Sequence, residues 1–570
     1  MAFVALGILS TLAYGQIELE QLDGLWKARV DFASEPEVAV RILRESERWQ
    51  VTGPLGVEVA AVPLADGTFQ ADFGEIGVLR FEPEGSVGPG VSFWIQTPSP
   101  LLSQSTATPV RRESSSDGSW AGRAQPLDDA TELFLSIDRQ GDSQRVEFVE
   151  HSLNFGRFWR TSRLVANGPE SIVFEGMEPT VTGTLDPDGG LVLSSEALEP
   201  LVFRRVEATD VPGYLPGGVG EAATNPHAID DGWETASPED VGLNARIIDS
   251  LLATLSDPER SSLASTRVHS VQIARYGKLV VDAYFFGRQP SDVHVTRSAG
   301  KTIGSLLLGA SVGYEGIDVL HERLLDLLPG QVGQDASRVT LGEVIAMRSG
   351  LRADDNDPEC PAEENNVQGS GVGDWYAPVL QAPVRHAPGS HFAYSSMSIN
   401  IAGAVISERT GRWMPALLED ELFSPMQIRT YHVNLMPSQD AYLGGGIRVR
   451  PRDLLKLGQL VIDVGRWNGQ QVVPAEWLVA TTAPQSEVRP GLSYASGWWE
   501  RVYEIDGREV STIQALGNGG QVVVASPELG IAACFTAGNY GDRQAAAQIA
   551  DELVPQYVLR AAMQGTGANR

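Results

Sequence analysis

A serine and a lysine in helical register, Ser298 and Lys301, are the residues of this chain best suited to chemistry. They lie in the segment V-T-R-S-A-G-K-T-I-G-S-L-L-L-G (295–309), whose apolar continuation predicts a central helix. Residues at i and i+3 share one helix face, so the lysine amine can reach the serine hydroxyl. Burial disfavours the charged lysine, and a neutral lysine is a general base for a serine nucleophile. The helix N-terminus would supply amides for an oxyanion.

The same stretch also contains Gly300-Lys301-Thr302, which resembles the end of a phosphate-binding loop. Such a loop requires G-x-x-x-x-G-K-[ST], because glycine amides must wrap the phosphates. Here Val295 occupies the position of the first glycine, and the short strand before it is interrupted by His294. The nucleophile interpretation is therefore the stronger one.

Two later segments can complete a hydrolytic site. Tyr394 and Ser396 precede a helical pattern in H-F-A-Y-S-S-M-S-I-N, and the Tyr394 phenol can act as a second proton carrier. A glycine-rich turn before the last apolar hairpin can bring an edge strand beside the nucleophile as an oxyanion donor. We expect an amide near Gly520 and Gln521 to face the oxyanion; the candidate residues of this turn are Asn518, Gly519, Gly520 and Gln521.

Three tryptophans, Trp375, Trp498 and Trp499, are candidate walls of a substrate pocket, because such pockets are largely aromatic and apolar. Core packing is an equally good interpretation of each. No H-E-x-x-H motif or other metal-ligand spacing occurs among the eight histidines, so we predict no metal and no cofactor. The two cysteines, Cys360 and Cys534, do not form a disulfide framework, and their pairing stays open.

Composition bounds the partners and the location of the protein. The net charge of −30 argues against a nucleic-acid or anionic-membrane surface. Residues 1–15 form an apolar run ending in Ala-Tyr-Gly, which predicts a signal peptide and export to the periplasm or medium, with a buried first strand as the alternative. No other run reaches the roughly 18 apolar residues of a spanning helix. The sequence does not indicate an oligomeric state.

Residues 16–207 alternate apolar and polar positions between turn residues, which predicts an all-β domain. The segment Asp23–Trp26 recurs as Asp117–Trp120 about 94 residues later, so we expect two half repeats forming one closed barrel, lipocalin-like in shape, or a sandwich. Residues 99–118 would be a mobile connection between the halves. The Pro- and Gly-rich residues 208–231 predict a linker, after which we expect residues 232–562 to fold separately.

The region 232–562 predicts an α+β domain. An apolar hairpin at 269–287 and another at 521–538 enclose a series of helical patterns, and a helix ends the region. Strands at both ends with helices between them favour one antiparallel sheet joined by both termini. Residues 563–570 would be a flexible tail.

With S-x-x-K, Y-S-S and G-N-G-G-Q in this order, residues 232–562 resemble the β-lactamase-related serine hydrolases, which include class C β-lactamases, D-Ala-D-Ala peptidases and esterases. Segments such as D-G-W-E-T-A-S-P-E-D and V-T-L-G-E-V-I-A-M-R-S-G-L extend the resemblance. It implies a five-stranded antiparallel sheet flanked by helices, a helical subdomain, and a site between them. It also implies that an ester or small amide acylates Ser298, with Lys301 and Tyr394 sharing the protons.

Two departures from the family pattern bear on the substrate. Ser396 stands where the second motif commonly has asparagine, and Asn518-Gly519-Gly520 stands where the third motif has Lys-Thr-Gly or His-x-Gly. Without that cation, recognition of a penicillin carboxylate is not expected, and the pattern is nearer to the esterase and 6-aminohexanoate-dimer-hydrolase branch. A non-catalytic ligand-binding or sensor protein that retains the fold is the alternative function.

Overall fold

A computed structural model describes residues 19–565 apart from the segments 32–37, 46–47, 54–55, 75–76, 82–90, 99–104, 114–119, 125–129, 141–142, 151–161, 169–170, 176–179, 196–197, 212, 218–222, 259–266, 313–315 and 541. The predicted signal peptide and the last residues of the tail lie outside the described residues. The chain divides into two compact units, Met1–Phe32 with Ala130–Leu215, and Ala33–Asp129 with Pro216–Arg570. Residues 33–129 therefore belong with the C-terminal part of the chain and not with the rest of the predicted 16–207 domain.

The first unit is a closed antiparallel barrel of eight strands, built from β1 and the strands after residue 129 and not from the two half repeats predicted over 16–207. Its core includes Trp26, Leu135 and Ile137, which are at most 2% exposed, and the Trp26 indole N–H donates to Leu22 O at 2.8 Å. Apolar side chains thus fill this barrel. The strands are β1 (Gly24–Asp31), β11 (Ala130–Gln140), β12 (Ser143–Glu150), β13 (Ser162–Ala166), β14 (Ile172–Glu175), β15 (Val181–Leu185), β16 (Leu191–Ser195) and β17 (Leu198–Val206).

Residues 33–129 are inserted between β1 and β11 and form a second sheet that belongs to the second unit. Its strand β9 (Ser105–Glu113) pairs with β22 (Tyr431–Leu435), so the predicted mobile connection at 99–118 contains a strand. The Val433↔Ala107 pair places Ala107 in the main hydrophobic core. The other strands are β2 (Val38–Glu45), β3 (Arg48–Thr52), β4 (Glu58–Ala60), β5 (Val62–Pro63), β6 (Phe69–Asp72), β7 (Val78–Phe81), β8 (Val91–Pro98), β10 (Trp120–Ala124), β21 (His294–Val295) and β23 (Ile447–Val449).

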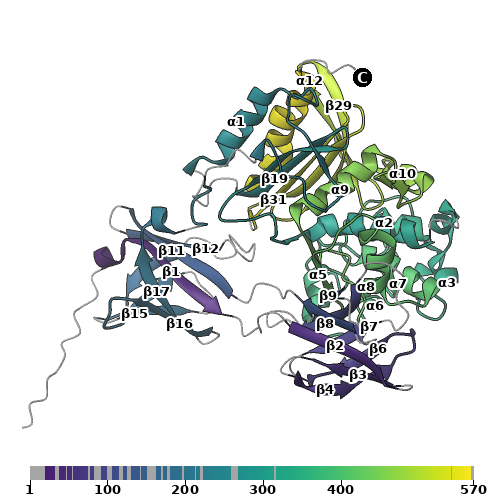
Figure 1. The fold of residues 1–570 in the computed structure, drawn as a ribbon, viewed down its shortest axis with the longest axis horizontal. Coiled ribbons are helices and arrows are strands. Elements are labelled where there is room, and N and C mark those ends of the chain that lie inside the picture. Colours follow the sequence, from purple (N-terminus) through teal and green to yellow (C-terminus); the bar gives the residue numbers. More distant parts are fainter. Residues whose placement is uncertain are drawn as a thin grey trace, which may run out of the picture. The chain divides into compact units, whose positions relative to one another are not determined.

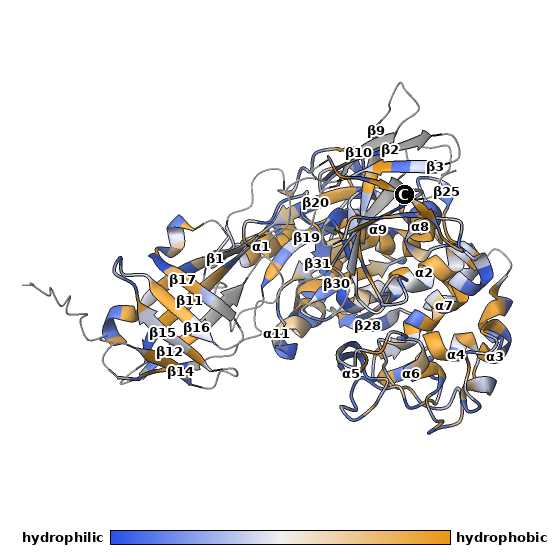
Figure 2. Cartoon of the chain, turned by 90° about the horizontal axis from the view of Figure 1, so that it is seen from below, coloured by the Kyte–Doolittle hydropathy of each residue, from blue (hydrophilic) through white to orange (hydrophobic). Residues whose placement is uncertain are grey.

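The other large sheet of the second unit has nine strands, whereas the family resemblance implied a five-stranded sheet. Its middle strands β19, β31 and β30 are buried at every position, because helices cover both sides, and β30 is largely hydrophobic (Figure 2). Along β30, Val522 and Val524 join one core cluster while Val523 and Ala525 join the other, as the two-residue period of a strand requires. In order the strands are β18 (Glu234–Thr235), β20 (Lys278–Tyr284), β19 (Val268–Arg275), β31 (Ile531–Ala537), β30 (Gln521–Ser526), β29 (Arg508–Gly517), β28 (Trp499–Ile505), β27 (Leu492–Tyr494) and β26 (Ser486–Arg489), and β18 is parallel to β20.

Helices α1 and α12 cover one face of this sheet and α9 the other (Figure 1). None of the helices in the described part of the chain is long and apolar enough to cross a membrane. The helices are α1 (Ala245–Leu255), α2 (Gly300–Val312), α3 (Leu324–Leu327), α4 (Leu341–Ile345), α5 (Glu364–Gly369), α6 (Ala377–Leu380), α7 (Ser398–Thr410), α8 (Met414–Leu417), α9 (Pro451–Ile462), α10 (Ala475–Thr482), α11 (Arg543–Gln548), the π-helix η12 (Ile549–Leu559) and α12 (Arg560–Met563).

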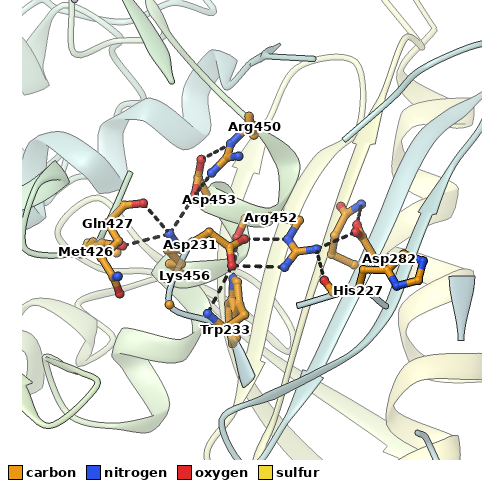
Figure 3. A network of polar contacts seen from close by, with 12 residues as sticks. His227, Asp231, Trp233, Asp282, Met426, Gln427, Arg450, Arg452, Asp453 and Lys456 are labelled. Atoms are coloured by element: carbon orange, nitrogen blue, oxygen red, sulfur yellow. Dashed lines mark hydrogen bonds and ion pairs between the residues drawn. The ribbon is translucent and has the colours of Figure 1, made fainter. Parts of the chain in front are cut away.

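The end of the predicted linker is fixed by a buried ionic network (Figure 3). Arg452 on α9 donates to Asp231 at 2.7 Å and to Asp282 on β20 at 3.1 Å, and the first two side chains are at most 2% exposed. Nearby on α9, Lys456 pairs with Asp453 at 2.8 Å. These contacts attach the end of the predicted linker, at Asp231, to helix α9 and to strand β20 of the nine-stranded sheet. Both cysteines lie buried elsewhere in the same unit as free thiols, so the pairing left open by the sequence does not occur.

Candidate active site

The predicted nucleophile lies at the entrance of the buried helix α2. Ser298 is half-buried in the short 3-10 helix η7 (Arg297–Ala299), which continues into α2, and Lys301 on the first turn of α2 is 1% exposed. Arg297 has φ 48°, a left-handed conformation that is uncommon for a non-glycine residue. This turn between β21 and α2 separates the serine from the preceding strand.

The Lys301 amine is held by three oxygen atoms. Its Nζ lies 2.9 Å from Ser298 Oγ, 3.0 Å from Ser396 Oγ and 2.9 Å from the carbonyl oxygen of Gly444. Leu443, next to Gly444, donates its amide to Asn400 Oδ1 on α7 at 2.9 Å, which fixes the loop that carries this carbonyl. The predicted Ser–Lys pair is therefore brought together, and Gly444 is a participant that sequence reasoning missed.

The second motif precedes α7 and reaches the lysine through Ser396 and Tyr394. The Lys301 Nζ lies 4.9 Å from the centroid of the Tyr394 ring and therefore faces the ring itself. In the described part of the chain, the Tyr394 phenol forms no hydrogen bond with Ser298 or Lys301. The hydroxyl in contact with the amine is that of Ser396, which is 1% exposed.

Asp355 is the second participant that the sequence did not single out. Its Oδ2 accepts the Ser396 amide at 2.7 Å, and its own amide donates to Tyr394 O at 2.8 Å. Burial raises the pKa of the Asp355 carboxyl, while hydrogen bonds from Ser396 and the charge of Lys301 act in the opposite direction. Asp355 belongs to the acidic stretch D-D-N-D-P-E-C-P-A-E-E-N-N, where nothing in the residue types separates it from solvated neighbours.

The third motif forms a tight turn between β29 and β30 beside the nucleophile. A Cβ atom on Gly517 would lie 2.4 Å from Thr296 O, so the end of β29 approaches the backbone just before Ser298. Strand β28 pairs with β29 only as far as Gln514, so residues 515–517 extend past it. The Gly520 amide donates to Gly517 O at 3.2 Å within the turn. The end of β29 at Gly517 thus lies against the backbone just before the nucleophile, while the Gly520 amide is engaged within the turn.

The other residues predicted at this turn stabilise it from behind. The Gln521 side chain is buried and donates to Ala537 O at 2.7 Å and to the Tyr540 hydroxyl at 3.2 Å. Gly519 has φ 84°, and a Cβ there would lie 2.6 Å from the Tyr540 ring, so only glycine fits. Asn518 is exposed at the tip of the turn.

Only one of the three predicted tryptophans is placed beside the catalytic groups. Trp499 is half-buried with its ring centroid 6.1 Å from that of Tyr394, and it also contacts Tyr494 and Phe392. The other two lie in the main core: Trp375, 2% exposed, packs edge-on against Tyr442, and Trp498 is 1% exposed. An aromatic wall of Phe392, Tyr394, Tyr494 and Trp499 therefore borders the Ser–Lys pair.

Within the described ranges, no group of three or more His, Cys, Asp or Glu residues is placed so that it could hold a metal ion. The groups gathered at Ser298 are instead those of proton transfer and acyl chemistry: a hydroxyl, a buried amine, a second hydroxyl and a carboxyl.

Comparisons with known proteins give consistent matches. The Beta-lactamase family model matches residues 257–554, which include all three motifs. The 6-aminohexanoate-dimer hydrolase of Paenarthrobacter ureafaciens is 21% identical over 302 residues, covering 49% of this chain and 74% of that protein. A family VIII carboxylesterase structure is 16% identical with a TM-score of 0.44, over 58% of this chain and 98% of its own. A D-stereospecific amidohydrolase from Streptomyces sp. is 21% identical with a TM-score of 0.40, over 51% and 95% of the two chains.

Proposed function

Because the chain belongs to the Beta-lactamase family, we propose that it is a serine hydrolase whose Ser298 is acylated by an ester or small amide. The observation that carries the proposal is the 2.9 Å contact between Lys301 Nζ and Ser298 Oγ, with the lysine almost fully buried. In its neutral form the amine has a lone pair that can take the serine proton. The names of the relatives, a dimer hydrolase acting on an amide and a carboxylesterase, support an ester or amide as substrate.

The catalytic cycle follows from this geometry. Ser298 Oγ bonds to the acyl carbon while its proton passes to Lys301 Nζ. The oxyanion that forms is stabilised by the Ser298 amide and by the backbone edge 515–517. The intermediate then expels the alcohol or amine, which takes up the proton by way of Lys301 or Tyr394. Water attacks the acyl-enzyme by the same route, and Ser298 regains its proton.

We propose that the preferred substrates are uncharged near the acyl group. Asn518 is neutral where relatives have a cation, and Arg450, an alternative cation, donates to Asp453 at 2.7 Å. A substrate carboxylate would lose water without gaining a partner, which costs free energy that a neutral ester avoids. The half-buried rings of Phe392 and Trp499 favour an apolar or aromatic group on the substrate.

The decisive experiment is labelling with a fluorophosphonate probe. Wild-type protein is expected to be labelled, and Ser298→Ala, the matched blank, is not. A panel of p-nitrophenyl esters, nitrocefin and amino-acid amides then ranks substrates, and neutral short-chain esters should exceed nitrocefin at least ~10-fold in kcat/KM, since one charge contact contributes roughly 1–3 kcal/mol. Unlabelled, inactive wild type would instead favour a non-catalytic binding protein, and efficient nitrocefin hydrolysis would contradict the preference for neutral substrates.

We further propose that the protein is exported, from the apolar run of residues 1–15. N-terminal sequencing of protein recovered from the periplasm or medium of an expressing bacterium tests this. A new N-terminus near Gln16 is the expected result, and intact protein confined to the cytoplasm would contradict it.

A further inference from the structure

The three oxygen atoms around Lys301 restrict how its hydrogen atoms can be arranged. A neutral amine has two N–H donors and one lone pair. The Gly444 carbonyl, 2.9 Å away, can only accept, so it takes one N–H. The other N–H and the lone pair must be divided between the hydroxyls of Ser298 and Ser396. Only one of the two divisions leaves the lone pair facing Ser298, where general-base catalysis needs it.

The direction of the Ser396 hydroxyl decides between these arrangements. If Ser396 accepts an N–H from Lys301, its own O–H must donate to another acceptor. The Asp355 carboxyl is beside it: Oδ2 accepts the Ser396 amide at 2.7 Å, and the Ser396 side chain lowers the pKa of this carboxyl. Asp355 Oδ1 is buried and has no hydrogen-bond partner within the described part of the chain. An acceptor that lacks a donor thus lies beside a hydroxyl that needs an acceptor.

We propose that Asp355 is a positioning residue: its carboxylate accepts the Ser396 hydroxyl, which turns the Lys301 lone pair toward Ser298. The inference rests on the proposed function, because it assigns a direction to the hydrogen bonds that activate the nucleophile. A protonated Asp355 would reverse the chain. It would donate to Ser396, Ser396 would donate to Lys301, and the lone pair would no longer be available to Ser298.

The direction should therefore depend on pH. Burial raises the pKa of the Asp355 carboxyl, the hydrogen bonds from Ser396 and the charge of Lys301 lower it, and the charge of Glu364 raises it. The Tyr442 phenol, which donates to Glu364, also faces this carboxyl. An ionised carboxylate can only accept from Ser396, whereas a neutral carboxyl can also donate to it, so the working direction is lost as pH falls through this raised pKa.

Two substitutions at Asp355 separate this role from a merely structural one. Asp355→Asn keeps an acceptor for the Ser396 amide, but its NH₂ can donate to Ser396 Oγ and hold the reversed direction. Asp355→Ala removes both interactions and leaves the Ser396 hydroxyl free to rotate. We expect Asp355→Asn to lower kcat/KM by ~10²-fold, the lower end of the range for losing a general base, and Asp355→Ala to lower it less. A role confined to holding the loop predicts the opposite order, because Asn is the better structural replacement.

The measurements are the second-order rate of Ser298 labelling by a fluorophosphonate and kcat/KM for p-nitrophenyl acetate between about pH 4 and 9. Asp355→Asn should also shift the acid limb of the pH profile, and in a Ser396→Ala background it should have little further effect. Asp354→Asn is the matched control, since the Asp354 carboxyl only accepts from Asn356 at 2.9 and 3.1 Å, and should behave as wild type.

The outcomes are distinguishable. A larger loss for Ala than for Asn, or an unchanged acid limb in Asn, overturns the inference while labelled wild type leaves the proposed function intact. Wild type that is not labelled overturns both. Melting temperatures of all variants identify a folding defect; if Asp355→Asn does not fold, the comparison uses Ser396→Ala, whose acid limb should differ from that of wild type, and an identical limb contradicts the inference.

Discussion

Substituting Gly517 by alanine should weaken stabilisation of the oxyanion while leaving the lysine base in place. A Cβ at this position would lie 2.4 Å from the carbonyl oxygen of Thr296 and 2.9 Å from Gln521 Cβ. Thr296 is two residues before the nucleophile, and its oxygen is a backbone atom that cannot rotate away. The added methyl group must therefore separate the end of β29 from the segment that carries Ser298.

The size of the effect follows from that distance. An ordinary carbon–oxygen contact is about 3.3 Å, so the two backbones must part by roughly 1 Å. A misplacement of about 1 Å near reacting groups can reduce a rate by ~10²-fold, equivalent to about 2.7 kcal/mol of transition-state stabilisation. We expect this loss in kcat, because the oxyanion forms only during the reaction. The Lys301–Ser298 contact is made within η7 and α2 and should remain.

The assay compares initial rates on p-nitrophenyl acetate with the melting temperature of each protein. Gly373→Ala is the matched control, since a Cβ there would meet no atom within 4 Å. It should retain the wild-type rate. Gly517→Ala with wild-type activity and an unchanged melting temperature would refute the placement of β29 beside the nucleophile.

Three further predictions concern the base, acid stability and the buried network. Lys301→Ala should lower kcat by ~10²–10⁴, and a loss of less than tenfold on p-nitrophenyl acetate would exclude it as the base. Burial lowers the pKa of His294 and of His432 to about 3, so below pH 6.5 the unfolded chain binds protons that the folded protein does not bind. The free energy of unfolding should therefore fall from pH 6.5 toward pH 3, by roughly 2 kcal/mol per histidine at pH 5. A urea midpoint that stays constant over this range would contradict the prediction. Asp231→Asn should cost ~3–5 kcal/mol in urea unfolding because it leaves a buried arginine short of a partner, whereas Asp230→Asn, at an exposed pair, should cost under about 1 kcal/mol; equal costs would be the refuting result.

The Ser298–Lys301 pair could be predicted because its geometry is local. Three residues of helix place the two side chains on one face, whatever the rest of the chain does. The helix itself is evident from the apolar run of α2, all but one of whose residues are buried. Tyr394 and Ser396 could be associated with the pair only through the order of the motifs, and the structure shows that the hydroxyl in contact with the amine is that of Ser396.

Gly444 and Asp355 could not be predicted for a different reason. A backbone carbonyl is present in every residue, so Gly444 carries no signal in its side chain. Asp355 is one of several acids in a polar stretch, and its hydrogen bond with Ser396 and the nearby charge of Lys301 come from other segments. Such non-local contacts produce no periodic pattern of residue types from which they could be predicted.

Strand β9 is the clearest case, and it changes the role expected for the N-terminal region. Its residues S-T-A-T-P-V-R-R-E are mostly polar, as in a connection, yet they pair with β22 more than 300 residues later. Thr108 Oγ1 lies 2.9 Å from His432 Nδ1 beside this pairing. Within β22, the Asn434 amide donates to Gly446 O and Asn434 O accepts the Tyr442 amide, both at 2.8 Å, and these partners lie two residues to either side of Gly444.

The inserted sheet therefore supports, through a continuous set of backbone hydrogen bonds, the loop whose carbonyl accepts from Lys301. A chain beginning near residue 230 would lack β9, leave the β22 edge unpaired, and remove the fully buried Ala107 from the main core. Residues 232–562, which the sequence suggested could fold separately, are thus part of a larger unit. Among the described residues, the strands of the first barrel pair only with one another, so we expect this barrel to be the part of the N-terminal region that can be removed without loss of the site.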